Sequence, residues 1–320
     1  MKVVFFAASE YGLQCIEAVK CLNDIEIVGI ITTKQHYILR YGESQKKEMN
    51  NVIYNDLKNK SKSWKIPIYE ICKMNDNNTI GVLRKWNPDV IVVSGWYHLI
   101  GNTILKLPPK GVIGLHASLL PKYRGGAPLV WQIINGEKET GITLFYMDGE
   151  VDTGDIIAQK AVRIEENDTI KTVYEKVGRE GIKILIENLP LIKKGCALRK
   201  VQENIQEGDI YPQRTPEDGK IDWCQETGKI YDFIRAQTKP YPGAYIVIDG
   251  KAVKIWESAI CNVRKGKNVP GTIIGLDNVC EKIVPVVATL SEDTALKILD
   301  YTYEDESEET SLQWNLSHRL

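Results

Sequence analysis

Apolar strand patterns alternate with helical patterns along the first two hundred residues of the chain. VVFFAA (3–8) is a strand pattern, and the spacing of apolar residues in LQCIEAVKCL (13–22) is that of a helix. EIVGIITT (26–33) is a second strand, and the alternation continues through IPIYEI, TIGVLRKW, DVIVVSGW and GVIGLHAS. Continuous apolar strands separated by helices are typical of a parallel sheet that is covered on both faces. The alternation therefore predicts an α/β domain, which we expect to span residues 1–203.

The pattern changes after residue 203. QEGDIYPQRTPEDGKIDW (206–223) is polar and rich in turn residues, and IYDFIRAQ (230–237) is a short helix pattern. YIVIDGKAVKIWES (245–258) predicts a hairpin closed by Asp249-Gly250. Further short strands are predicted in PGTIIGL, IVPVVATL and ALKILDYTY. We therefore expect a small β-barrel over 204–303, followed by a mobile acidic tail over 304–320.

Composition and charge exclude several classes of partner. The net charge of −1 gives no overall field that would draw the chain to nucleic acid or to anionic lipid. No segment reaches the ~18 apolar residues of a membrane span, so we expect no membrane contact. The seven cysteines are scattered and contain no CxxC pair. This pattern favours free thiols in a reducing compartment, and hence a cytoplasmic location, over disulfides or a zinc site.

Two histidines lie where a parallel sheet places its ligands. Such ligands bind at the carboxyl ends of the strands, and His98 and His116 both follow predicted strands. Each histidine, taken alone, is more often structural than catalytic. The chain has no GxGxxG after its first strand, no P-loop and no GxSxG, so a nicotinamide cofactor is not expected.

The acidic loop MDGEVDTGD (147–155) and the loop after His116 supply further candidates. A calcium loop is excluded because position 12, counted from Asp148, is Gln159 rather than a bidentate glutamate; no metal site is expected. The acidic loop is either a solvated turn or the source of a carboxylate that orients His116. Arg124 is either a surface charge or an anion clamp for a substrate.

The stretch GLHASLLPKYRGGAPLVWQIINGEKETGITLFYMDGEVDTGDIIAQ (114–159) resembles the 10-formyltetrahydrofolate-dependent formyltransferases. Their shared signature is a His-x-Ser-Leu-Leu-Pro turn, an Arg-Gly pair and a Leu-Asp-x-Gly-Asp-like loop, found here at 116–121, 124–125 and 151–155. IRAQTKPYPGAYIVIDGKAVKIW (234–256) resembles the start of the C-terminal barrel in the transfer-RNA and amino-arabinose branches. The resemblance implies a Rossmann-like catalytic domain followed by an OB-like barrel.

The resemblance also implies roles for individual residues. His116 and Asp152 are the catalytic pair, with His116 as general base and then acid. Arg124 and Gly125 contact the substrate. The folate co-substrate, 10-formyltetrahydrofolate, is held at two strand ends and beside the turn, by His98, Leu99, Ile100, Ser118, Leu119, Leu120, Pro121, Asp148, Gly149, Glu150 and Val151. Family members commonly carry Asn two residues before the histidine as a donor to the oxyanion, and this chain has Gly114 there.

Three functions remain open, and two of them differ in the amine that accepts the formyl group. The LHxSLLPKYRG motif and the PYPG motif resemble those of the amino-arabinose branch, and they favour an amino sugar linked to a nucleotide, dTDP or UDP, as the acceptor. The alternative is the aminoacyl group of initiator transfer RNA, although the basic stretch 34–60 lacks the Gly-Arg-Gly-like pattern of that branch. Under the sugar reading no nucleic acid partner is expected. A third alternative is a 10-formyltetrahydrofolate hydrolase or folate-binding module. The sugar, its nucleotide and the oligomeric state stay open, with a homodimer among the options.

Overall fold

The computed structural model describes residues 1–41, 45–203, 210–248, 250–303 and 314–320. These residues form two compact units, the first made of Met1–Gly126, Thr140–Val162 and Lys176–Gln213, the second of Ala127–Glu139, Arg163–Glu175 and Arg214–Leu320. The boundary expected between residues 203 and 204 adjoins 204–209, which lie outside the described residues. The second unit takes in two segments that precede this boundary, because helix α5 (Pro128–Ile134) packs on α7 (Thr227–Arg235).

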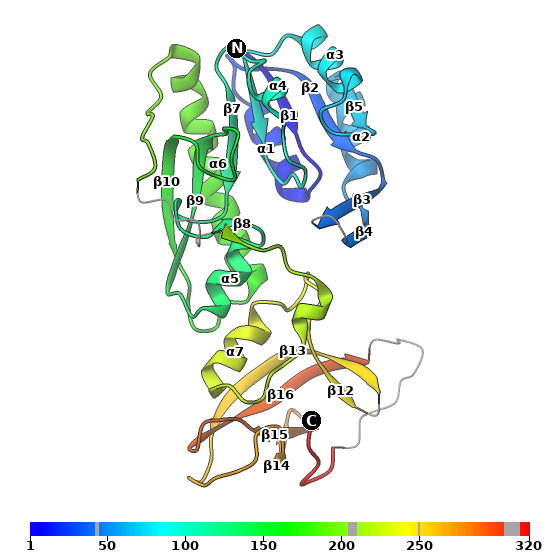
Figure 1. The fold of residues 1–320 in the computed structure, drawn as a ribbon, viewed down its shortest axis with the longest axis vertical. Coiled ribbons are helices and arrows are strands. Elements are labelled where there is room, and N and C mark those ends of the chain that lie inside the picture. Colours follow the sequence, from blue (N-terminus) through cyan, green and yellow to red (C-terminus); the bar gives the residue numbers. More distant parts are fainter. Residues whose placement is uncertain (42–44, 204–209, 249, 304–313) are drawn as a thin grey trace. The chain divides into compact units, whose positions relative to one another are not determined.

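A seven-stranded sheet in the order β10-β9-β7-β6-β1-β2-β5 organises the first unit (Figure 1). Five of its strands are parallel, namely β1 (Lys2–Phe6), β2 (Glu26–Thr33), β5 (Ile68–Ile71), β6 (Val90–Val93) and β7 (Val112–His116). The central strand β1 is buried from Val3 to Phe6, which explains its continuous apolar sequence. The predicted parallel α/β sheet is therefore confirmed. The prediction of parallel strands does not hold at one edge of the sheet. There β9 (Glu139–Tyr146) runs antiparallel to β7, and β10 (Ile156–Arg163) is the outermost strand.

Local sequence signals fix where the helices begin. Ser9 accepts a hydrogen bond from the Gly12 amide at the start of α1 (Glu10–Lys20), and Asp76 accepts one from the Thr79 amide at the start of α3 (Asn77–Trp86). The unit also contains the short α4 (Asn102–Leu105) and most of α6 (Ile170–Lys194).

The lysine-rich stretch after β2 has more structure than its polarity indicated. It forms an antiparallel hairpin, β3 (His36–Tyr41) with β4 (Gln45–Asn50), and then helix α2 (Tyr54–Trp64). The helix was missed because only Leu57 and Ser61 of its residues are buried, which leaves little apolar periodicity to read.

An antiparallel sheet forms the core of the second unit. Its order is β12-β13-β16-β15-β14, and its strands are β12 (Ala244–Ile248), β13 (Lys251–Asn262), β14 (Ile273–Val279), β15 (Lys282–Ala288) and β16 (Thr294–Tyr303). The predicted hairpin is present as the β12–β13 pair, although residue 249 of its turn lies outside the described residues. Closure into an OB-like barrel stays a prediction.

The end of the chain differs from the expected mobile tail. Residues 304–313 lie outside the described residues, but 314–320 pack on the second unit. Trp314 is 8% exposed and meets the ring of Tyr301 edge to face, with the centroids 5.1 Å apart. The Ile273 amide also donates to the His318 carbonyl. The expectation of a mobile tail is wrong for residues 314–320, because Trp314 is buried in the apolar core of the second unit.

The helices in the described ranges of the chain include none that is both long and apolar enough to traverse a lipid bilayer.

Candidate active site

His116 is the last residue of β7 and lies at the carboxyl edge of the parallel strands. Its side chain is nearly buried, with the residue 8% exposed. Nε2 lies 2.8 Å from the Tyr123 carbonyl oxygen. Because a carbonyl can only accept, Nε2 must carry the hydrogen in this bond.

Asp152 approaches the other side of the same ring. It belongs to the loop between β9 and β10, and its Oδ2 lies 3.4 Å from Nδ1 of His116. The same oxygen accepts a hydrogen bond of 2.9 Å from the Gly125 amide. A neutral ring protonated at Nε2 would direct the Nδ1 lone pair at this carboxylate, whereas an imidazolium donates to both partners. Both ring nitrogens therefore face an oxygen that can accept a hydrogen bond.

Backbone conformation places the Asp152 carboxylate. Asp152 has a φ of 53°, in the left-handed region that aspartate tolerates better than most residues. Two residues later, a Cβ on Gly154 would lie 1.8 Å from the Tyr146 carbonyl oxygen, so only glycine fits there. Asp148 accepts hydrogen bonds from the Thr153 hydroxyl and the Glu150 amide, which closes the start of the loop. Gly149 is exposed and Val151 is partly exposed.

Arg124 is oriented inward. The residue is 3% exposed, and its Nη1 lies 3.4 Å from the Val151 carbonyl oxygen. An anion clamp needs an accessible guanidinium, whereas this one supports the acidic loop. Contact of Arg124 and Gly125 with an acceptor stays a prediction.

The Ser-Leu-Leu-Pro turn is held by hydrogen bonds from the neighbouring strands. Ser118 is fully buried, and its hydroxyl donates to the Lys122 carbonyl at 2.6 Å. Thr143 of β9 accepts from the Leu120 amide and donates to the Ser118 carbonyl. Gln159 of β10 donates to the Leu120 carbonyl at 2.8 Å. Leu119 is half-buried, and Pro121 follows a cis peptide bond.

The segment after β6 forms a second edge of the candidate site. His98 meets Trp96 edge to face at 5.4 Å and lies 5.9 Å from the ring of Tyr37. Burial lowers the pKa of His98 below its ordinary value. Leu99 is 80% exposed, and Ile100 is buried in the apolar core beside α3.

Gly114 lies on the same face of β7 as His116, since side chains two apart in a strand share a face. A Cβ at Gly114 would meet Cε1 of Phe145 at 3.1 Å and both Cγ and Sδ of Met147 at 3.3 Å. The space that a side chain would occupy is therefore bordered by apolar groups from β9 and the residue after it.

Three supporting residues lacked any signal in the sequence. Asn75 accepts from the Gly101 amide and donates to the Leu99 carbonyl, so it fixes the segment after β6. Gln159 is only the last residue of the stretch 114–159, and Gln202 lies outside every motif. A single Asn or Gln side chain belongs to no sequence motif, so its hydrogen-bond partners become visible only in the folded structure. Among the residues with described positions, no three His, Cys, Asp or Glu side chains gather as a metal site.

Comparisons with known proteins cover both units. The formyl transferase family model matches residues 1–189, and the model of the formyl transferase C-terminal domain matches residues 214–318. The bifunctional polymyxin resistance protein ArnA of Wigglesworthia glossinidia brevipalpis is 36% identical over 87% of this chain, which spans 40% of that protein. The methionyl-tRNA formyltransferase of Clostridioides difficile (strain 630) is 35% identical over 86% of this chain and 85% of its own length.

A solved structure shares the fold. The N-formyltransferase of Helicobacter canadensis, in complex with folinic acid and dTDP-3-aminofucose, aligns with a TM-score of 0.62 at 18% identity, covering 93% of this chain and 98% of its own. The predicted family, fold class and enzyme class are confirmed by these matches. The chain belongs to the formyl transferase family, whose members are enzymes that transfer formyl groups and use 10-formyltetrahydrofolate as co-substrate.

Proposed function

We propose that the chain transfers the formyl group of 10-formyltetrahydrofolate to a primary amine, with His116 and Asp152 as the catalytic pair. One observation carries the assignment: the 3.4 Å approach of the Asp152 carboxylate to the His116 ring at the carboxyl edge of the sheet. The amine nitrogen attacks the formyl carbon and forms a C–N bond. The bond from that carbon to the folate nitrogen then breaks, and the proton lost by the amine passes to the folate nitrogen.

His116 moves that proton. To accept it, the ring must be neutral with its hydrogen on Nδ1, facing Asp152, so that the bare Nε2 faces the acceptor amine in place of the Tyr123 carbonyl. The imidazolium that forms is stabilised by Asp152, which keeps its own proton-free state throughout. His116 then returns the proton to the leaving nitrogen.

The oxyanion of the tetrahedral intermediate needs a donor other than residue 114. A water at the side of Gly114 is disfavoured by the apolar side chains of Phe145 and Met147. The charged ring of His116, two residues along the same face, is the nearest candidate donor. Backbone amides of the acidic loop are the second.

The folate pterin lies between the segment after β6 and the acidic loop, beside residues 98–100 and 148–152. The Ser-Leu-Leu-Pro turn borders this site. Its side chains contribute shape rather than hydrogen bonds, because the Ser118 hydroxyl is already used within the turn.

The acceptor is a nucleotide-linked amino sugar. The net charge of −1 supplies no general attraction for transfer RNA, whose binding depends on phosphate contacts. The Helicobacter canadensis enzyme, with dTDP-3-aminofucose bound, shares the fold. Methionyl initiator transfer RNA is the second candidate, favoured by the 35% identity with the Clostridioides difficile enzyme along 85% of that protein.

An acceptor panel tests both candidates. Purified protein and 10-formyltetrahydrofolate are incubated with dTDP- and UDP-linked 3-amino and 4-amino sugars, with methionyl initiator transfer RNA, and with no acceptor. We expect formylation of one sugar nucleotide. Turnover of the RNA with none of any sugar contradicts the sugar assignment, and formate release without acceptor indicates the hydrolase alternative. The His116→Ala variant, run beside the wild type, checks that turnover depends on this site.

A further inference from the structure

Both members of the candidate pair are held by one short loop. The Tyr123 carbonyl accepts from Nε2 of His116, and the Gly125 amide donates to Oδ2 of Asp152. Gly125, with a φ of 92°, adopts its conformation freely, but Tyr123 has a φ of 58°, which a residue with a Cβ keeps only when its surroundings support it. What supports this loop also sets the distance between the ring and the carboxylate.

The support comes from β11 (Ile210–Tyr211), far along the chain. It pairs with β8 (Arg124–Gly125), and the Gly126 amide donates to the Tyr211 carbonyl at 2.8 Å. The Tyr211 ring stacks on the ring of Tyr123 with centroids 4.7 Å apart and an angle of 20°. The approach is close enough that a Cβ on Gly125 would lie 2.5 Å from the Tyr211 carbonyl oxygen.

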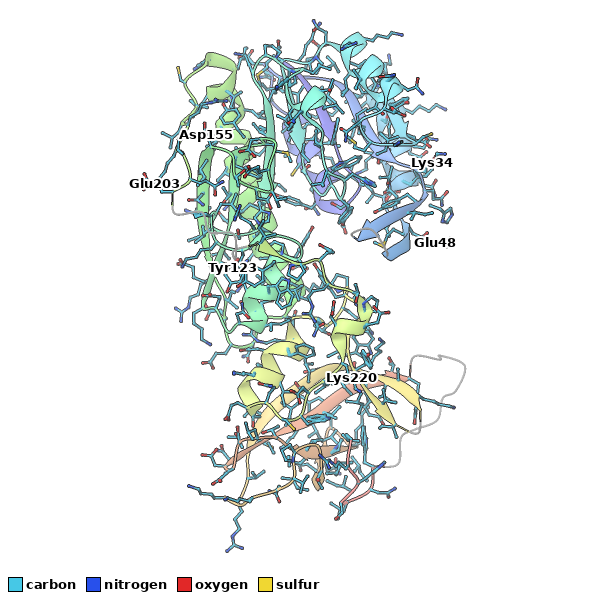
Figure 2. The ribbon with its side chains drawn as sticks, in the orientation of Figure 1. Lys34, Glu48, Tyr123, Asp155, Glu203 and Lys220 are labelled. Atoms are coloured by element: carbon cyan, nitrogen blue, oxygen red, sulfur yellow. The ribbon has the colours of Figure 1, made fainter. Side chains whose placement is uncertain are left out.

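The acidic loop is supported by the segment that follows α6. Lys200 pairs with Ile156 through two backbone hydrogen bonds of 2.8 and 2.9 Å. Gln202, which is 7% exposed, donates from Nε2 to the Asp152 carbonyl at 3.0 Å and to the Gly154 carbonyl at 2.7 Å. Both neighbours are acceptors, so the amide nitrogen must face them. This one side chain therefore bridges the carbonyls of Asp152 and Gly154 and holds the backbone turn that carries the Asp152 carboxylate. Figure 2 shows Asp155, Glu203 and Tyr123 on the same side of the unit, away from Lys34 and Glu48.

We propose that Gln202 and Tyr211 are positioning residues for the His116–Asp152 pair: Gln202 fixes the left-handed backbone of Asp152, and Tyr211 fixes the loop that touches both catalytic groups. Each acts through a neighbour, Gln202 through the Asp152 and Gly154 carbonyls and Tyr211 through the ring of Tyr123. The proposal rests on the catalytic assignment made above, and it adds that Gln202 and Tyr211, which both follow α6 in the chain, complete the site of the first unit.

The test compares four variants with the wild type. Gln202→Met keeps the length of the side chain and removes both donors, and Tyr211→Ala removes the stacked ring. Tyr211→Phe keeps the ring and serves as the conservative rescue. Val201→Ala, at an adjacent position that is 67% exposed, is the matched control. Thermal unfolding is measured for each variant, so that loss of fold is separated from loss of positioning.

The first readout needs no acceptor. Ring 15N spectra resolve the four histidines, and the His116 signals are assigned by their loss in His116→Ala. We expect these signals in Gln202→Met and Tyr211→Ala to move toward their positions in Asp152→Asn, while Tyr211→Phe and Val201→Ala match the wild type. Unchanged His116 signals in both Gln202→Met and Tyr211→Ala overturn the proposal.

The second readout is turnover of 10-formyltetrahydrofolate with the sugar nucleotide or transfer RNA that the acceptor panel selects. We expect Gln202→Met to lower kcat about 10- to 100-fold, the cost of a small misplacement, with KM little changed. In an Asp152→Asn background the same substitution should cause little further loss, because Gln202 acts through Asp152. If Gln202→Met lowers kcat in the Asp152→Asn background by the same factor as in the wild type, the proposal is overturned. If His116→Ala itself keeps full turnover, the catalytic assignment fails, and the ring signals still decide whether Gln202 and Tyr211 set the pair.

Discussion

Oδ2 of Asp152 faces Nδ1 of His116 at 3.4 Å while it accepts the Gly125 amide at 2.9 Å. One carboxylate oxygen therefore joins the end of β7, the loop after it and the loop between β9 and β10. The second nitrogen of the ring faces the Tyr123 carbonyl, so both sides of His116 meet oxygen. In the proposed mechanism, this arrangement stabilises the imidazolium that forms when the ring takes a proton from an amine.

Gly114→Asn should leave kcat unchanged or lower it. The new side chain must enter a space where Phe145 and Met147 already lie within 3.1–3.3 Å of a Cβ. Steady-state kinetics with the preferred acceptor checks this. A gain of about a hundredfold or more, the usual worth of an oxyanion donor, contradicts it and identifies Gly114 as a deficit. Gly114→Asn combined with Met147→Ala is the matched control, because it makes room for the amide.

His98→Gln should change how stability depends on pH. The pKa of His98 is lowered by burial in the folded state, so the unfolded chain binds the extra proton more readily. The resulting stability is present above the ordinary histidine value of about 6.5 and is lost as the pH falls through the lower folded value. Urea unfolding from about pH 7.5 to 5 should show a steeper loss in the wild type than in the variant. If stability falls with pH equally in the wild type and in His98→Gln, burial does not lower the pKa of His98.

Trp314→Ala should destabilise the second unit by about 3–5 kcal/mol, the typical cost of truncating a buried aromatic side chain. The ring is buried against Tyr301 in a core that also contains Trp223. Thermal or urea unfolding measures the loss. Leu316→Ala, at a position that is 60% exposed, is the control and should change stability little. Equal stability of Trp314→Ala and the wild type would show that the end of the chain is detached in solution.

Strong periodicity made much of the architecture predictable. The expected strand at 26–33 is β2, and continuous apolar runs gave the parallel strands, because a strand covered on both faces must be apolar throughout. The hairpin β3–β4 escaped prediction, and so did helix α2, which buries too few side chains to leave a pattern. Trp314 escaped because an acidic sequence precedes it, while its burial depends on a core formed by distant strands.

The site was predictable only as separate pieces. The motifs supplied His116 and the acidic loop, but their meeting depends on the antiparallel pairing of β7 with β9, which no local signal specified. The roles of Gln159 and Gln202 depend on carbonyls that lie 39 and 48–50 residues away along the chain. Conversely, both sequence readings of Arg124, a surface charge or an anion clamp, place its side chain at the surface, and its burial follows from the fold of the neighbouring loops.

A double-mutant cycle on His116 and Asp152 tests the central claim most directly. Each of His116→Ala and Asp152→Asn should lower kcat by about 10²–10⁴-fold, the range of general acid–base catalysis, while binding of 10-formyltetrahydrofolate persists. Because the two groups act as a unit, the double variant should be little slower than the worse single variant. Losses that multiply in the double variant would show that Asp152 only shapes the folate loop, and would contradict the account.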